Sequence, residues 1–288
     1  MVNGLPDDIG ARIRRATESI HALIYFVPEA QQHLTGAGLR PGRMCYFASR
    51  SAPMGAVSAG VTAATFYNFN PDLVARHIPR AWTLATPEAI VAARFAAADA
   101  ALCRLLGDTA LGSEEITEAA HLAREATTAL SPEGRPLYAG HATLDWPTEP
   151  HLILWHAITL LREYRGDGHV AALLTSGLSG VESIVTHTAT GTGFTEDSAK
   201  QLRGWSEDQW DGAIEALRTR GVLGAERLTE SGVALRREVE EATDRADRAA
   251  AAHLGPARTT RLIELTRVFS RAVRANGAFP EGVFASPR

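Results

Sequence analysis

The sequence predicts a mainly α-helical protein with two domains, residues 1–149 and 150–288. Two observations support this fold class. Helix N-caps and first-turn prolines recur along the chain, and apolar or amphipathic stretches of helical length follow them. The 288 residues are enough for two compact domains, and a composition of 45% hydrophobic and 22% charged residues is typical of a globular protein.

Capping residues delimit three helices in the first half. Residues 86–88, Thr-Pro-Glu, combine an N-cap, a first-turn proline and an acid that suits the helix dipole. The alanine-rich stretch 87–106 is apolar on nearly all sides, so we expect it to form a buried central pillar. Ser113 can cap a helix over 114–130, and Asn70 can cap a short helix that follows it.

Prolines and glycines predict an irregular connector over 131–150, and a helix is expected over 150–165. The Gly-Asp-Gly sequence at 166–168 lets the backbone turn sharply, so we expect this helix to end there. Asp167 is then expected to cap a second helix that begins at His169.

Residues 169–250 predict a winged-helix-like unit. Ser206 and Gln209 form a capping box, which fixes the start of a helix over 206–220. A tight reversal and a long helix from about Glu230 follow. The stretch from Arg220 to Gly232 resembles the segment of MarR-type regulators in which a helix ends, a β-wing turns back and a capped helix departs. We therefore expect a small β-wing here.

The N-terminal half contains a weak sequence repeat of this unit. Gly60-Val61 followed by Trp82 resembles Gly180-Val181 followed by Trp205. A degenerate winged-helix duplicate would explain the repeat, and so would chance similarity in an alanine-rich chain.

The helix over 206–220 is poorly suited to DNA. In a winged helix its outward face enters the major groove, and here that face carries Asp208, Asp211 and Glu215. Carboxylates repel phosphates, and the net charge of −4 provides no basic excess. The wing tip, residues 224–226, has no basic residue. DNA is therefore an unlikely partner of this helix, and the fold is expected to act as a scaffold.

Two stretches are rich in aromatic and polar residues, which suggests a ligand pocket. Aromatic walls with a few fixed hydrogen-bond donors suit a mostly apolar ligand, although such aromatic residues also build ordinary cores. The candidate ligand-binding residues of the first stretch are Tyr46, Phe47, Arg50, Phe66, Tyr67 and Asn68.

The second stretch contains His156, Glu163, Asp167 and His169, which we expect to converge on one pocket. Arg50, Arg162 or Arg165 would hold an anionic group there, and His156 and His169 would supply hydrogen bonds. In an enzyme, His156 or His169 would be a general base that Asp167 or Glu163 orients. The alternatives are a core histidine at 156 and an ion-paired carboxylate at 163. A metal site formed by these His, Asp and Glu side chains is a further alternative, although no known metal-ligand spacing is present. Another alternative is haem ligation by one of the histidines.

Four strings carry a resemblance to a known family: YFASRSAP, FYNFNP, LREYRGDGHVAALL and GWSEDQW with the later LTESG. They resemble a helix-turn-helix family of high-GC bacteria, distantly akin to MarR-type regulators, over residues 19–280. The resemblance implies a helix-turn-helix fold and DNA binding, and it supplies no catalytic residues.

The first functional hypothesis is therefore a protein that senses or sequesters a small molecule on a MarR-like scaffold, linked to specialised metabolism. The alternatives are an enzyme with a His/Asp/Glu pocket and a DNA-binding transcriptional regulator. The sequence identifies no cofactor. The long helices over 230–250 and 257–275 would pair in a homodimer or fold back over the N-terminal half.

The location expected from the sequence is the cytoplasm. No apolar run reaches the length of a membrane span, and the N-terminus does not resemble a secretion signal. Cys45 and Cys103 are too few for a disulfide framework or a thiolate metal site.

Overall fold

The computed structural model describes residues 4–191, 193–225 and 227–280, and this part of the chain is mainly helical, as predicted. The first half contains the helices α1 (Ile9–Ala22), α2 (Pro28–Gly36), α3 (Arg43–Ser51), α4 (Ala59–Phe66), α5 (Pro71–Ala75), α6 (Pro87–Leu111), α7 (Glu114–Thr127) and α8 (Pro136–Ala142). The second half contains α9 (Pro150–Thr175), α10 (Gly180–Thr188), α11 (Glu196–Arg203), α12 (Glu207–Thr219), α13 (Glu230–Ala246) and α14 (Arg248–Ala275). Short 3-10 turns lie at Leu23–Tyr25, Ala52–Met54 and Arg80–Thr83. None of the described helices is both long and apolar enough to cross a membrane.

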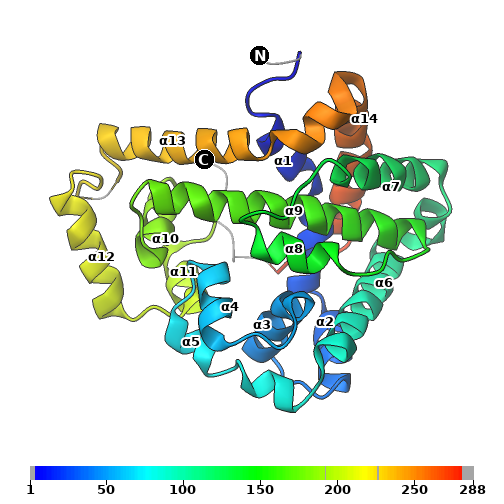
Figure 1. The fold of residues 1–288 in the computed structure, drawn as a ribbon, viewed down its shortest axis with the longest axis horizontal. Helices are drawn as coiled ribbons and strands as arrows, with labels where there is room; N and C mark the ends of the chain where they lie inside the picture. The colour runs from blue at the N-terminus through cyan, green and yellow to red at the C-terminus, as the bar shows by residue number, and fades with distance from the viewer. Residues whose placement is uncertain (1–3, 192, 226, 281–288) are drawn as a thin grey trace.

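The central helix of the molecule is α9, which runs through the middle of the fold (Figure 1). Helices α1, α7, α8 and α13 all pack against it. The predicted pillar, α6, lies at the edge and leaves one face to solvent, including Cys103 and Arg104. The prediction was wrong because alanine counts as apolar but is small enough to lie on either the surface or the core side of a helix.

The predicted break at 166–168 is also wrong, because α9 continues through it to Thr175. Gly168 serves a close approach between helices instead of a turn. A Cβ atom at this position would lie 2.8 Å from Nη1 of Arg135 and 3.3 Å from Cβ of Ala246 on α13. The glycine therefore allows α13 and the residues before α8 to lie against α9.

The capping signals elsewhere correctly mark helix starts. Ser113 caps α7, Asn70 caps α5, and Ser206 forms the expected capping box with Gln209 at the start of α12. The predicted connector over 131–150 nevertheless contains the short helix α8.

The predicted β-wing does not form strands in the part of the chain that the structure describes. Leu223 and Leu228 make a single antiparallel bridge, with Gly224 N–H donating to the Arg227 carbonyl. Too few residues separate α12 from α13 to extend this bridge into a ladder. Glu226, at the predicted tip, lies outside the described residues.

Three larger apolar cores and two smaller ones stabilise the described part of the chain. The largest joins α1, α2, α6, α7, α9 and α14 and includes Trp155. A second contains Phe47 and lies among α3, α4, α5 and the start of α6. The third fills the unit formed by α10 to α13, around Trp210 and Leu217 of α12.

The turn between α4 and α5, residues 67–70, joins the second core to this C-terminal unit. The Tyr67 hydroxyl donates to the Leu178 carbonyl, and the Trp205 indole donates to the Asn68 carbonyl at 2.9 Å. The Asn70 amide donates to the Gly204 carbonyl at 2.9 Å and to the Gln209 side chain at 3.0 Å. Both ends of the α11–α12 turn are thus attached to the N-terminal half.

Candidate functional site

A chamber of about 360 Å³ lies among α1, α3, α9, α10 and α13. It brings together most of the residues predicted to bind a ligand: Tyr46, Arg50, Phe66, Tyr67, Asn68, Glu163, Arg165, Asp167 and His169. Phe47 and His156 do not line it. A broad hollow of about 430 Å³ also lies on the surface at the start of α7, but none of the predicted site residues lines it.

Aromatic rings form one wall of the chamber. The Tyr46 ring centroid lies 6.4 Å from that of Phe66 and 5.4 Å from that of Phe69. Phe47 stacks behind Phe66, with centroids 6.0 Å apart, and is fully buried in the second core. The sequence therefore located the aromatic cluster, while Phe47 belongs to the core that supports it.

The polar centre of the chamber is a buried ion pair between α3 and α9. Nη2 of Arg50 lies 3.1 Å from Oε2 of Glu163, and Arg162 donates to the same oxygen at 2.8 Å. Burial disfavours the Glu163 carboxylate, but the two arginines hold its pKa well below the usual value. The Tyr46 hydroxyl accepts a hydrogen bond from Nη1 of Arg50 at 3.0 Å, which fixes the guanidinium against the aromatic wall.

Arg165 and His169 lie further along α9, beside α13. Arg165 is neutralised by carboxylates: Nη1 lies 2.7 Å from Asp244 and 3.3 Å from Asp247. Nδ1 of His169 is hydrogen-bonded to the Thr243 hydroxyl at 2.9 Å, and burial lowers the pKa of His169 to about 4. The imidazole is therefore neutral at pH 7, and its orienting partner is a hydroxyl group.

Asp167 caps a helix, but it is not the helix that the sequence suggested. Its Oδ2 accepts the backbone N–H groups of Leu137 at 3.0 Å and Tyr138 at 2.9 Å, in the first turn of α8. Burial raises the pKa of Asp167 to about 6, although these hydrogen bonds oppose the shift. The carboxylate is committed to positioning α8, so it is not free to orient a catalytic histidine.

His156 lies in a separate environment. Its ring packs against Trp146, with centroids 4.8 Å apart, and against Phe95 at 5.5 Å. The imidazole is 1% exposed, and neither of its nitrogens has a hydrogen-bond partner among the described residues. Burial, and after it the charge of Arg94, lowers the pKa of His156 to about 4. The predicted convergence therefore includes Glu163, Asp167 and His169, but not His156.

Arg203 is a chamber residue that the sequence analysis missed. Its Cζ lies 4.3 Å from the Phe69 ring centroid and 5.3 Å from that of Phe194, and its Nε has no hydrogen-bond partner in the part of the chain that the structure describes. Burial lowers the pKa of Arg203 to about 10, so the side chain remains charged at pH 7. It comes from the end of α11, and only the tertiary fold brings it to the aromatic wall.

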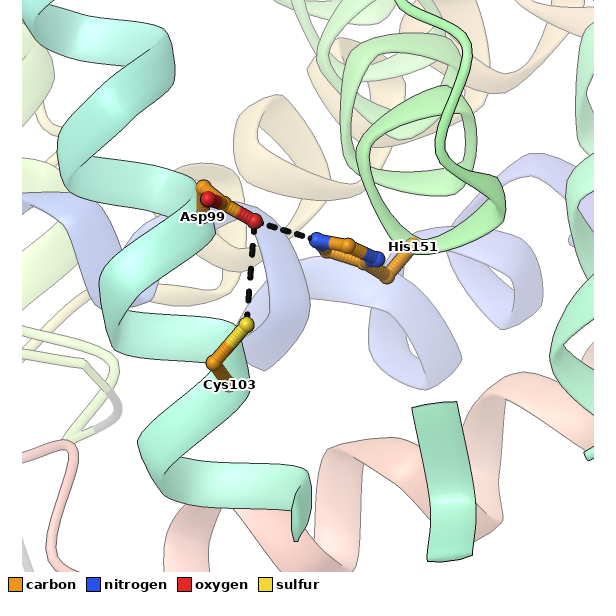
Figure 2. A group of neighbouring side chains, drawn as sticks. All are labelled: Asp99, Cys103 and His151. Atoms are coloured by element: carbon orange, nitrogen blue, oxygen red, sulfur yellow. Dashed lines mark hydrogen bonds and ion pairs between the residues drawn. The ribbon is translucent and has the colours of Figure 1, made fainter. Parts of the chain in front are cut away.

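The sequence analysis did not predict a group of possible metal ligands, because its residues lie on two helices that are far apart in the sequence. Figure 2 shows Asp99 and Cys103 on α6 facing His151 at the start of α9. Nε2 of His151 lies 2.6 Å from Oδ1 of Asp99, and one ligand atom from each residue lies within 4.8 Å of the others. Aspartate, cysteine and histidine all bind zinc in proteins, and an open zinc site has three protein ligands. The Asp99–His151 hydrogen bond alone also explains why the two side chains meet.

The outward face of α12 is acidic, as predicted: Asp208, Asp211 and Glu215 are all exposed. The N-terminal residues of a recognition helix usually contact base edges. In this chain, the side chain of Gln209 in the first turn is already bonded to Asn70 and Ser206.

The comparisons with known proteins concern nearly the whole chain. Searches of curated proteins and of solved structures found no match. A family described as a helix-turn-helix family matches residues 10–280, which include every element of the chamber. The chain therefore belongs to this helix-turn-helix family.

Proposed function

We propose that the protein binds a small, mostly apolar molecule in the chamber and thereby senses or sequesters it. The observation that supports this proposal is the chamber itself, about 360 Å³ in volume, with an aromatic wall beside buried charges. Small-molecule sites usually have a volume of a few hundred Å³ and combine apolar walls with a few fixed polar groups.

The arrangement of charges suggests which residues would contact the ligand. Tyr46, Phe66 and Phe69 would contact its rings or alkyl groups. Arg203 would bind an anionic substituent, because its charge is stacked on rings and not neutralised by a carboxylate as that of Arg165 is. His169 would supply a hydrogen bond from a neutral imidazole.

The MarR-like ancestry and the link to specialised metabolism are further parts of this proposal. Both are supported by the sequence resemblance, and membership of a helix-turn-helix family is compatible with them. The same membership favours a second candidate, a DNA-binding regulator. The acidic face of α12 and the Gln209–Asn70 hydrogen bond weigh against contact through that helix.

Two matched leucine variants test the chamber. Phe66 and Phe47 stack on each other, but only Phe66 lines the chamber. We expect a library of aromatic metabolites to contain compounds that raise the melting temperature of the wild-type protein, since a ligand that binds only the folded state stabilises it. Phe66→Leu should reduce this shift, whereas Phe47→Leu should lower the basal melting temperature and retain the shift.

Three results would count against the proposal. These are no stabilisation by any compound, an equal loss of the shift in both variants, and stabilisation that Phe66→Leu leaves unchanged. Salt-sensitive binding of the full chain to one DNA sequence at physiological salt would favour the regulator instead.

A further inference from the structure

Arg94 on α6 is a buried cation without a counter-ion. The residue is 2% exposed, and none of its three guanidinium nitrogens has a hydrogen-bond partner in the described part of the chain. Its Cζ lies 5.2 Å from the Trp155 ring centroid and 5.6 Å from that of Tyr25. Ring contacts stabilise a cation, but they leave its five N–H groups without acceptors. Arginine also stays protonated where a buried lysine or histidine would become neutral.

Other unpartnered polar atoms gather around Arg94. Nε1 of Trp155, both ring nitrogens of His156 and Nε2 of His141 lack partners, and each of these residues is at most 2% exposed. Together with Arg94 they hold seven of the thirteen unpartnered buried side-chain atoms among the described residues. Buried polar groups in folded proteins are nearly always hydrogen-bonded, so this concentration indicates a site that takes a ligand.

Contacts between α6 and α9 bring Arg94, Trp155 and His156 into one part of the core. His156 follows Trp155 in α9, and its ring lies 5.5 Å from that of Phe95, the residue after Arg94. His141 enters from α8; burial and then the charge of Arg94 lower its pKa to about 3. Helices α6, α8 and α9 thus each contribute to one buried cluster.

The cluster needs a negatively charged acceptor. A guanidinium and an indole only donate hydrogen bonds, and a neutral imidazole donates one. The buried carboxylate nearby, Glu163, is bonded to Arg50 and Arg162 and does not pair with Arg94. The site therefore has donors and positive charge in excess.

We propose that Arg94, His141, His156 and Trp155 form an inner binding site for a small carboxylate, separate from the chamber. The two oxygens of a carboxylate match the planar fork of a guanidinium, and such two-pronged, charge-assisted pairs are among the strong hydrogen bonds of proteins. The rings of Phe95 and Trp146 beside His156 provide an apolar surface for the remainder of the acid. None of the four residues lines the chamber, so this inference does not depend on the function proposed for it.

The test compares acetate with other anions on the full-length protein at pH 7.5. Melting temperature and isothermal titration are measured with sodium acetate, chloride and sulfate at equal ionic strength. We expect saturable stabilisation by acetate alone. In Arg94→Met the affinity for acetate should fall by about tenfold or more, because a charge-assisted, two-pronged contact is lost.

Arg104→Met is the matched control. It removes the same charge from an exposed arginine of the same helix, α6, whose guanidinium is bonded to Glu29 and not to any residue of the proposed site. It should bind acetate as the wild type does, and so should the chamber variant Phe66→Leu. If Arg94→Met does not fold, His156→Phe serves as the second variant and should also weaken acetate binding.

Several outcomes would overturn the inference. Equal effects of the three anions on the wild-type protein, or stabilisation by sulfate alone, would exclude a carboxylate site. Unchanged acetate affinity in Arg94→Met would exclude Arg94 as its ligand. The anion comparison uses only the wild-type protein, so it is decisive even if both variants fail to fold.

Discussion

Cys103 shows how one neighbouring side chain controls the chemistry of another. The thiol is exposed, and its pKa is raised by partial burial and by the adjacent Asp99 carboxylate. Its sulfur lies 3.7 Å from Oδ1 of Asp99. Because the thiolate is the reactive form, the carboxylate should make an accessible cysteine slow to react.

We therefore expect iodoacetamide to modify Cys103 slowly at pH 7.5. Asp99→Asn should lower the pKa of the thiol and speed the reaction several-fold, as measured by intact-mass spectrometry over time. Cys45 is an internal control: it is buried, and burial raises its pKa to about 11, so it should remain unmodified in both proteins. Equal rates in the wild type and Asp99→Asn would show that the carboxylate does not control this thiol.

At the residue scale, the sequence analysis named Arg50 and Glu163 as candidate site residues, but it could not show that they bind each other. It missed Arg94 and Arg203, because an arginine within an alanine-rich helix or at a helix end carries no local sign of burial. The roles of such residues depend on packing between segments that are far apart in the sequence.

At the scale of helices, two glycines of α9 differ in role: one only lowers the helix propensity of the backbone, and the other is required by packing. Gly166 and Gly168 are two residues apart in one continuous helix. A Cβ atom at Gly166 would make only an ordinary contact, 3.7 Å from Oε2 of Glu163. At Gly168 it would meet Arg135, whose guanidinium donates to the carbonyls of Tyr164 and Ala246.

Gly166→Ala should increase the free energy of unfolding by up to about 1 kcal/mol, because alanine favours the helix. Gly168→Ala should decrease it by about 1–3 kcal/mol, because the Arg135 guanidinium or α13 must shift. Urea denaturation of both variants against the wild type measures the difference. Destabilisation of similar size in both would indicate that the helix bends at these glycines after all.

Helix starts were predictable because capping is a local interaction, as Ser113 and Ser206 show. The helix break at 166–168 was not, because a glycine required for close approach looks the same in sequence as one required for a turn. The prediction of a β-wing failed for a related reason. The reversal between α12 and α13 was expected from its sequence, but strand formation needs more paired residues than this reversal contains.

For the molecule as a whole, buried neutral histidines set the response to acid. Burial lowers the pKa of His141 to about 3 and those of His156, His169 and His187 to about 4. The unfolded chain therefore takes up protons below about pH 6.5 that the folded chain excludes. Burial also raises the pKa of Asp167 to about 6 and that of Asp247 to about 7, which acts in the opposite direction.

Burial also holds the pKa of His21 well below its usual value. These histidines outweigh the two carboxyl groups, so the unfolded state should bind about three more protons than the folded state near pH 5. The free energy of unfolding should then fall by about 4 kcal/mol per pH unit around that pH. Urea denaturation at half-unit steps from pH 7 to pH 4.5 measures this slope. A stability that is constant or rises as the pH falls through this range would contradict the buried, neutral state of these histidines.

The turn at residues 67–70 gives the molecule a mechanical connection with consequences for both halves. Tyr67, Asn68 and Phe69 line the chamber, and Asn70 binds the first turn of α12. Filling the cavity acts on residues 67–69 and moving α12 acts on Asn70, so both events act on one turn of four consecutive residues. Coupling free energies between two sites are reciprocal. If a cavity ligand changes the affinity for a partner that displaces α12, that partner must change the affinity for the cavity ligand by the same factor.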